Sequence, residues 1–284
     1  MEYRQFGLTQ RDVAVVGQGT WNPESGDRAQ AMTALRTGLD LGMNHIDTAE
    51  MYGDGSMEEL VSEAIFGRRD EVFLVSKVLP ENASRRKTVT ACERSLSRLR
   101  TDRLDCYLLH WRGSYPLADT FAAFDQLHRD GKILSWGVSN FDEPDLDEAL
   151  EIIGNVDEQQ LVCTQVLYHL KERAIEHTVI PWCEEHQVAV TAYSPFGSGD
   201  FPDPSTREGR VLQEIAAAHE ATPRQVALSF LLRWPSMFAI PKASKPGHVV
   251  ENAKAPDLRL SEEDLSRIDL AFPRGPKPKV LPMI

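Results

Sequence analysis

The sequence has few cysteines and no long apolar run. Its 284 residues include four cysteines, which lie far apart and form no CxxC pair: Cys92, Cys106, Cys163 and Cys183. This spacing indicates reduced thiols of a cytosolic protein rather than a disulfide framework, and we expect no metal site. No stretch approaches the roughly 18 apolar residues that a membrane span needs, and the charged N-terminal stretch does not match a secretory signal. We therefore expect a cytoplasmic protein that makes no membrane contact.

Positive charge is also scarce. Lys and Arg number 31 against 43 Asp and Glu, which gives a formal net charge of -12. That balance argues against nucleic acids and anionic membranes as partners, and an anionic cofactor would need a local basic site. A dinucleotide fingerprint is missing as well, because Gly17-Gln18-Gly19 has no third glycine. The absence disfavours a doubly wound sheet.

What the chain does have is an alternation of short apolar runs and amphipathic stretches. The runs predict strands at Val15–Gly19, Asn44–Asp47, Val72–Lys77, Leu104–His110, Leu134–Ser139, Val162–Leu167, Val188–Tyr193 and Phe238–Pro241. Apolar steps of three and four predict helices at Arg28–Leu41, Met57–Phe66, Arg86–Leu99, Leu117–His128, Asp145–Ile153, Val179–His186 and Arg210–His219. Several strands are apolar on both faces, as in a buried parallel sheet. Eight such units in this length predict an α/β fold, a (β/α)8 TIM barrel.

Both ends of the chain add to this barrel. Tyr3–Phe6 and Val13–Val15 flank a polar turn and predict a hairpin, so that residues 1–14 cap the barrel bottom. Leu260–Ala271 opens with the capping pattern S-x-x-D at Ser261 and predicts an extra helix. Phe272–Ile284, rich in proline and lysine, predicts a tail. No linker splits the chain, so we expect one domain over residues 1–284 and a monomer.

Polar residues gather where the expected strands end. Active sites of β/α barrels lie at the C-terminal ends of the strands. Asp47, Lys77 and His110 end three successive strands. At or near the ends of the later strands lie Ser139, Asn140, Gln165, Tyr193 and Ser194, and Lys242 follows the last strand. Each has an ordinary explanation on its own: a lysine reaching solvent, a core histidine, an aspartate forming a turn. Their convergence on one rim favours a functional site.

These residue types suit proton donation. A tyrosine hydroxyl, with a pKa near 10, is a poor acid unless a neighbouring ammonium stabilises the phenolate. Tyr52 follows Asp47 in a loop; without charged neighbours it would be an ordinary loop aromatic. A carboxylate such as Asp47 would keep Lys77 charged, and His110 would hold a carbonyl oxygen near Tyr52. The set fits carbonyl reduction by hydride from a bound cofactor.

At this point the chain resembles a known family. Gly42–Gly53 resembles the G-x-x-x-[IF]-D-T-A-x-x-Y-G motif of aldo-keto reductases. Further similar segments follow in the family's order: Val16–Trp21, Val75–Lys77, Asp105–Trp111, Gly137–Phe141, Gln165–His169 and Ala192–Gly199. The resemblance runs from the first strand to Asn252. It implies a catalytic tetrad at Asp47, Tyr52, Lys77 and His110, with Tyr52 as the general acid.

The resemblance also implies a nicotinamide cofactor extended over the barrel mouth. Ser139, Asn140 and Gln165 would hold its carboxamide, Tyr193 would stack on the nicotinamide, and Ser194–Ser198 would line the pyrophosphate. The implied cofactor residues are Gly19, Thr20, Trp21, Asp47, Ser139, Asn140, Gln165, Tyr193, Ser194, Pro195, Phe196, Ser198, Ile240, Pro241, Lys242, Ala243, Ser244, His248, Glu251 and Asn252.

Ile240–Asn252 resembles the segment that clasps the adenosine 2′-phosphate and adenine, which is the local basic site anticipated above. It keeps Lys242, but Ala243 stands where a serine is expected and His248 where an arginine is expected. Ser244–Lys245 would compensate. We expect NADPH in preference to NADH, with a weakened margin, because histidine does not reproduce the bidentate grip of arginine on a phosphate.

The expected substrate pocket has aromatic walls. Trp21 and Trp111 flank the site in sequence and resemble the walls of the family's pocket beside Tyr52 and His110; packing at the barrel rim is the alternative. The short segment Trp111–Leu117 indicates an open pocket for small aldehydes and 2-oxoaldehydes. VGQGTW, LLHW and VLYHL resemble bacterial members that reduce methylglyoxal.

Two other functions fit parts of the pattern. One is a barrel aldolase that forms a Schiff base through Lys77, which would require a neutral amine. Asp47 and Tyr52 favour the charged form instead. The other is a non-enzymatic cofactor-sensing subunit, because some proteins with this fold regulate ion channels. The complete set of four polar residues argues against that role.

Overall fold

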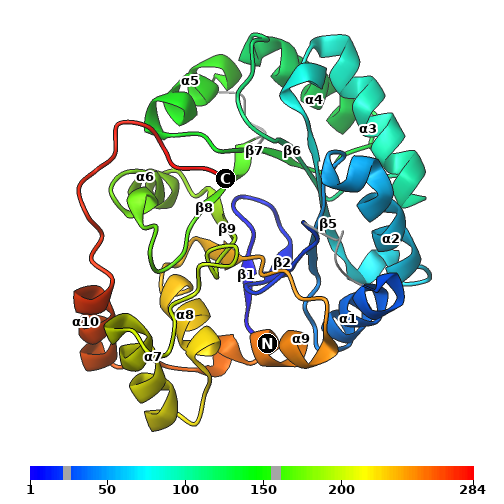
Figure 1. Ribbon diagram of the computed structural model, residues 1–284. Coiled ribbons are helices and arrows are strands. Elements are labelled where there is room, and N and C mark those ends of the chain that lie inside the picture. Colours follow the sequence, from blue (N-terminus) through cyan, green and yellow to red (C-terminus); the bar gives the residue numbers. More distant parts are fainter. Residues whose placement is uncertain (22–26, 155–160) are drawn as a thin grey trace.

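The computed structural model describes residues 1–21, 27–154 and 161–284, and in these ranges the chain forms a closed parallel barrel (Figure 1). The barrel strands pair side by side in chain order: β3 (Gln18–Gly19), β4 (His45–Asp47), β5 (Phe73–Val78), β6 (Cys106–Leu109), β7 (Trp136–Ser139), β8 (Leu161–Leu167), β9 (Ala189–Tyr193) and β10 (Met237–Ala239). Parallel bridges from Val16 to Ala239 and from Gly19 to Lys242 join the last strand to the first. The predicted β/α barrel is confirmed.

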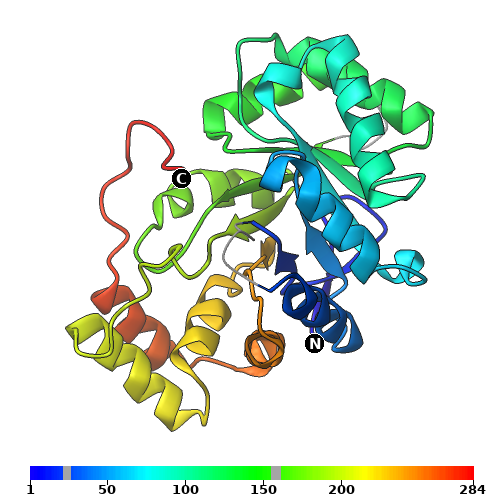
Figure 2. The same cartoon turned by 45° about the vertical axis from the view of Figure 1, so that its right-hand side comes forward.

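Helices surround the strands, as Figures 1 and 2 show. They are α1 (Arg28–Asp40), α2 (Ser56–Ala64), α3 (Arg85–Leu99), α4 (Leu117–Arg129), α5 (Glu143–Ile153), α6 (Val179–Glu185), α7 (Arg207–Ala218), α8 (Pro223–Leu231), α9 (Pro246–Ala253) and α10 (Glu262–Ala271). Short 3-10 turns lie at η1 (Tyr52–Gly55), η2 (Arg69–Glu71), η3 (Pro80–Asn82), η4 (Ala174–Glu176) and η5 (Ala255–Asp257). No helix in the part of the chain that the structure describes is long and apolar enough to cross a membrane.

Two helices were not predicted. The run from Val226 to Leu231 in α8 is almost entirely buried, so it lacks the polar positions that give a helix its period. Helix α9 has eight residues, with Pro246 and Gly247 in its first turn. Several predicted strands are longer than the observed ones. An apolar run extends over all buried residues, whereas an observed strand includes only residues whose backbone pairs with a neighbouring strand.

The N-terminal hairpin closes the bottom of the barrel, as predicted. Strands β1 (Tyr3–Gln5) and β2 (Asp12–Ala14) pair antiparallel. Phe6 lies in the turn between them, and its ring centre is 4.7 Å from that of Phe73 and 4.9 Å from that of Phe238. Phe73 begins β5, and Phe238 lies in β10. Gly7 has a φ of +54°, and a side chain there would collide with the carbonyl oxygen of Val162. The opposite end, where the strands end, remains available for a site.

Thiols fill part of the barrel interior. The Sγ atoms of Cys106 and Cys163 lie 3.8 Å apart and both side chains are buried. Strand β7 runs between their strands, and a side chain at Gly137 would collide with the Cys163 Sγ. The two thiols therefore pack in the core of the barrel.

The C-terminal segment forms the extra helix and then turns back to the barrel. Helix α10 begins at the predicted capping box of Ser261 and Asp264. Beyond it, Arg173 donates to the carbonyl of Phe272 at 2.6 Å, and His177 donates to that of Gly275 at 3.1 Å. Figures 1 and 2 show the red segment leaving α10 and returning toward the strands.

Candidate active site

A buried cluster of charged and phenolic groups lies at the mouth of the barrel. Lys77, on β5, is fully buried, and its Nζ donates to Asp47 Oδ1 at 2.6 Å, to the Thr48 carbonyl at 2.9 Å and to the Tyr52 hydroxyl at 3.1 Å. Asp47 ends β4, and Tyr52 opens η1 just after it. The chain therefore turns back over β4 and β5 and brings the phenol to the ion pair.

Lys77 carries a proton in this setting. Burial acts to lower the pKa of its amine, but the charges of Asp47 and Tyr52 and their hydrogen bonds outweigh burial and raise the pKa overall. Burial raises the pKa of Asp47, and the ammonium of Lys77 together with hydrogen bonds from Lys77 and Gln165 opposes that rise. The 2.6 Å contact is an ion pair. A charged ammonium disfavours the Schiff-base chemistry of an aldolase.

Tyr52 is held fully protonated until its proton is needed. Burial raises the pKa of the phenol; Lys77 opposes the rise and Asp47 adds to it. Lys77 acts in the expected direction on this pKa, but removal of the phenol from water outweighs the ammonium. The hydroxyl accepts a hydrogen bond from Lys77, so its own hydrogen is free to be donated elsewhere. When that proton leaves, the ammonium stabilises the phenolate.

His110 lies directly after β6, with its ring 5.8 Å from the ring of Tyr52. Burial, followed by the charge of Lys77, lowers its pKa to about 2. The imidazole is therefore neutral, and its Nδ1 has no hydrogen-bond partner among the residues that the structure describes. A neutral ring of this kind donates a hydrogen bond to an oxygen but does not act as a proton source.

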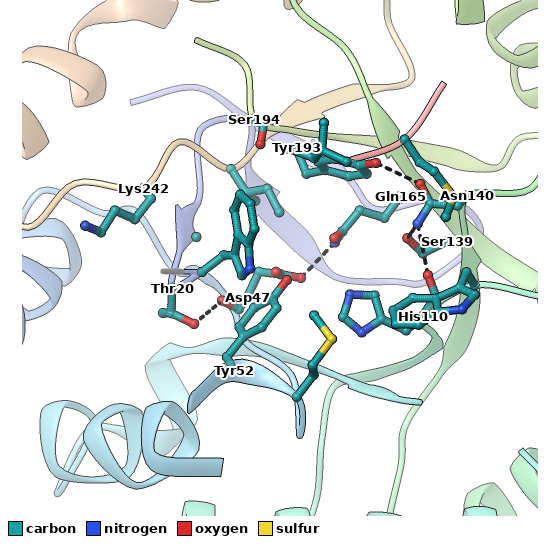
Figure 3. Close-up of a pocket in the computed structure, with 17 residues that line it drawn as sticks. Thr20, Asp47, Tyr52, His110, Ser139, Asn140, Gln165, Tyr193, Ser194 and Lys242 are labelled. Atoms are coloured by element: carbon teal, nitrogen blue, oxygen red, sulfur yellow. Dashed lines mark hydrogen bonds between the residues drawn. The ribbon is translucent and has the colours of Figure 1, made fainter. Parts of the chain in front are cut away.

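A cavity of about 390 Å³ opens above this cluster (Figure 3). Its lining combines the predicted polar residues with apolar walls: Gly19, Thr20, Trp21, Asp47, Met51, Tyr52, His110, Trp111, Ser139, Asn140, Gln165, Tyr193, Ser194, Ile240, Lys242, Met283 and Ile284. The structure thus brings Asp47, Tyr52 and His110 together in one cavity, with Lys77 buried beneath it. Trp21 and Trp111 both face this cavity, as expected for substrate walls.

Polar side chains follow one another along the rim of the cavity. Gln165 Nε2 donates to Asp47 Oδ2 at 2.8 Å, Asn140 Nδ2 donates to Ser139 Oγ at 3.1 Å, and the Tyr193 hydroxyl donates to Asn140 Oδ1 at 2.8 Å (Figure 3). These amide and hydroxyl groups can exchange their mutual bonds for those of a bound carboxamide. The rim therefore fits the nicotinamide end of a dinucleotide.

Two rim residues have unusual backbone conformations. Asn140 has a φ of +60° and Ser194 a φ of +49°, a region that residues other than glycine rarely occupy. Each follows a strand directly, Asn140 after β7 and Ser194 after β9, and each lines the cavity. Strain of this kind clusters at functional sites.

The predicted residues for the adenosine end lie beyond the cavity. Ile240, Lys242 and Ser194 line its edge, and Figure 3 shows Lys242 pointing away from Tyr52. The remaining expected contacts do not line the cavity: Pro195, Phe196, Ser198, Pro241, Ala243, Ser244, His248, Glu251 and Asn252. They continue outward in the loop after β9 and along the segment that leads into α9. An extended ligand that leaves the cavity past Lys242 would follow them.

The C-terminal residues Met283 and Ile284 were not predicted to belong to the site. Both line the cavity, and the backbone of Ile284 opposes the burial that raises the pKa of Tyr193 to about 12. No local sequence pattern predicts that Met283 and Ile284 reach the cavity, because this contact requires the tail to turn back to the barrel after α10. Met51 also lines the cavity. Because it precedes Tyr52 inside the same motif, its position in the sequence could have indicated that it belongs to the site.

Glu50 is a further residue without a predicted role. Its carboxylate is buried and accepts from the backbone N–H of Leu79 and from Asn82 Nδ2, each at 2.8 Å. It thereby ties the segment that carries Tyr52 to the segment that follows Lys77. Among the residues described, no group of three or more His, Cys, Asp or Glu side chains is placed to hold a metal ion.

Comparison with known proteins agrees with this geometry. The aldo/keto reductase family model matches residues 15–271. Methylglyoxal reductase YeaE of Escherichia coli is 45% identical over 266 residues, covering 93% of this chain and 92% of that protein, and glyoxal reductase of Bacillus subtilis is 34% identical, covering 89% and 87%. A crystal structure of an aldo/keto reductase from Klebsiella pneumoniae in complex with NADP and acetate has a TM-score of 0.90 at 44% identity, covering 98% of each chain. The chain belongs to the aldo/keto reductase family of NAD(P)H-dependent oxidoreductases.

Proposed function

We propose that this protein reduces small aldehydes and 2-oxoaldehydes, with methylglyoxal as the representative substrate, to alcohols at the expense of NADPH. The observation that carries the proposal is the Tyr52 hydroxyl, which is bonded to the buried Lys77–Asp47 pair and faces a cavity beside the neutral ring of His110. NADPH supplies the hydride that adds to the carbonyl carbon.

The residues of the chain supply the proton and the orientation. Tyr52 acts as the general acid and transfers its proton to the carbonyl oxygen as negative charge develops there. Lys77 stabilises the resulting phenolate, and Asp47 keeps Lys77 charged and aimed. His110 donates a hydrogen bond to the same oxygen and holds it within reach of Tyr52. Both donors sit in a site largely removed from water, where such interactions are strongest.

The proposed cofactor contacts follow the groove from the cavity outward. Ser139, Asn140 and Gln165 would hold the carboxamide, and Tyr193 would pack against the nicotinamide. The loop 194–198 lines the pyrophosphate, and the segment 240–252 receives the adenosine end. Gly19, Thr20 and Trp21 complete the wall opposite the rim. The Klebsiella relatives solved with NADP and with NADPH, at 44% and 42% identity, support the choice of NADPH.

Substrate size is limited by the walls of the cavity. The cavity of about 390 Å³ must hold both the nicotinamide and the substrate, so the nicotinamide takes part of the space that is open to the substrate. Trp21, Trp111, Met51, Met283 and Ile284 surround that space with apolar surface. The methylglyoxal and glyoxal reductases among the relatives support the assignment to 2-oxoaldehydes.

The test is a substrate panel assayed with NADPH and NADH side by side. We expect methylglyoxal and small aldehydes to be reduced with the highest kcat/KM, bulky ketones to be poor substrates, and NADPH to be preferred. A flat profile over substrate size, or activity with NADH only, would contradict the proposal. We also expect a cytoplasmic monomer, which sedimentation velocity of the purified protein would test.

A further inference from the structure

Arg224 is an exposed cation without a carboxylate partner in the part of the chain that the structure describes. It is the second residue of α8, and its guanidinium lies over two aromatic rings, 4.9 Å from the centre of Phe201 and 5.7 Å from that of Phe196. Among the described residues no hydrogen bond or ion pair engages the N–H groups of Arg224, and a cation–π attraction does not need them. Those donors are therefore free to bind an anion.

The position of Arg224 is fixed by the segments around it. Phe196 and Phe201 belong to the loop between β9 and α7, which begins at the cavity-lining residue Ser194. The start of α8 is also bonded to α9: the Thr222 hydroxyl donates to the carboxylate of Glu251, and Gln225 Nε2 donates to the Glu251 carbonyl at 3.0 Å. Helices α8 and α9 lie side by side in Figures 1 and 2.

Arg224 thus stands between the two segments that lead away from the cavity, the loop 194–201 and the segment 240–252. The second segment contributes exposed Lys242, Lys245 and His248 but no arginine. Lysine acts on a phosphate as a point charge and imidazole has no paired donors, whereas a guanidinium offers two parallel N–H bonds. A chain with a formal net charge of -12 needs such a group wherever a dianionic phosphate binds.

We propose that Arg224 binds the adenosine 2′-phosphate of NADPH, so that selection of the phosphorylated cofactor comes from α8 as well as from the segment 240–252. This inference rests on the use of NADPH proposed above. The contacts with Phe196 and Phe201 hold the guanidinium beside the loop and leave its N–H donors for the anion. The stacking also links the loop after β9 to the adenosine end, so phosphate binding and ordering of that loop occur together.

The competing explanation is that Arg224 only holds the loop through its two rings. Arg224→Met retains a long side chain that packs on both rings and removes the charge, and Arg224→Lys retains the charge without the paired donors. Arg267→Met is the matched control: it removes one charge from α10, where Arg267 pairs with Glu214 of α7. The measurement is binding of NADP⁺ and NAD⁺ to each purified variant by calorimetry, without substrate.

We expect Arg224→Met to weaken NADP⁺ binding about tenfold or more, and NAD⁺ binding by less than about twofold, because only NADP⁺ has the charge-assisted bonds to lose. Arg224→Lys should lie between, and Arg267→Met should match the wild type. Adenosine 2′,5′-bisphosphate should lose affinity as NADP⁺ does, and adenosine 5′-monophosphate should not. The salt dependence of NADP⁺ binding should also become shallower in Arg224→Met.

Equal weakening of NADP⁺ and NAD⁺ in Arg224→Met would show that Arg224 only holds the loop, and unchanged binding of both would show that it touches neither; either result overturns the inference. Failure of the proposed function is a different result. In that case the wild type itself shows no preference for NADP⁺ over NAD⁺, or does not reduce methylglyoxal with NADPH.

Discussion

The two ends of the cofactor groove are built in different ways. At the reaction end, Asp47 and Lys77 are buried on neighbouring strands and Tyr52 is bonded to them. At the proposed adenosine end, Lys242 is exposed on a loop and Arg224 is exposed at the start of α8. The first end is fixed by backbone geometry, whereas the second depends on long side chains.

This difference separates chemistry from cofactor choice. A buried ion pair is barely screened by salt, so the proton-transfer machinery should be insensitive to ionic strength. Exposed cations are screened and individually contribute little, so recognition of the phosphate must be shared among several. Substitutions at one end should therefore change turnover, and substitutions at the other should change nucleotide affinity.

The largest effect is expected at the reaction end. Tyr52→Phe removes the proton donor and keeps the ring, so kcat for methylglyoxal should fall by about 10³-fold or more. Affinity for NADPH, measured by quenching of tryptophan fluorescence, should stay within about twofold of the wild type. If substantial turnover survives, Tyr52 is not the proton donor.

Substitution of Glu50 tests whether catalysis depends on the hydrogen bonds that hold the Tyr52 segment in place. Glu50→Ala leaves the Leu79 N–H and Asn82 without their acceptor and loosens Tyr52 relative to Lys77, so kcat should fall by about 10- to 100-fold. NADPH affinity should change little. Glu81→Ala, which removes an exposed carboxylate from the same loop, is the control and should behave as the wild type. Loss of nucleotide affinity and kcat together in Glu50→Ala would indicate general disorder of the mouth instead.

The burial of His45 at the barrel bottom lowers the stability of the fold at acidic pH. His45 is fully buried among Phe6, Phe73 and Phe238, and burial, followed by the charge of Lys77, lowers its pKa to about 3. Below the ordinary pKa of 6.5 the unfolded chain binds a proton that the folded chain refuses, so stability falls as pH drops from 6.5 toward 3. At pH 5 this amounts to about 2 kcal/mol.

His45→Phe should remove that share of the acid sensitivity. The difference in unfolding free energy between pH 7 and pH 5, from urea titrations, should be smaller in the variant by about 2 kcal/mol. An unchanged difference would mean that His45 is protonated in the folded state.

The smallest effect is expected at the adenosine end. Lys242→Ala should weaken NADPH binding by about five- to tenfold and NADH binding by less, since only one of several cations is lost. kcat at saturating nucleotide should not change. Equal losses for both nucleotides would reject a role at the 2′-phosphate and would also weaken the contrast between the two ends.

Sequence reasoning worked where a local rule places a side chain. The rule that barrel sites lie where the strands end put Lys77 and His110 at the mouth, and the capping pattern located the start of α10 at Ser261. It failed where the contact is made by distant parts of the chain. Met283 reaches the cavity only because the tail returns, and Glu50 acts through Leu79 across two loops.

The direction in which the pKa of Tyr52 shifts could not be predicted from the sequence either. The ammonium beside it was predictable, but the degree to which the phenol is removed from water was not, and burial decides the sign. For the same reason α8 was missed: a helix buried on most sides has no period to recognise, and Arg224 at its start became visible only once α8 was placed against α9.

The central claim is that one carbonyl group receives a hydride from NADPH and a proton from Tyr52. The most direct measurement is to incubate the protein with methylglyoxal and NADPH that carries deuterium at both C4 positions of the nicotinamide, and to analyse the product by mass spectrometry and NMR. We predict one deuterium at the former carbonyl carbon of each alcohol formed, and almost no labelled product with Tyr52→Phe. An unlabelled product, or a borohydride-trapped adduct on Lys77 formed without nucleotide, would contradict it.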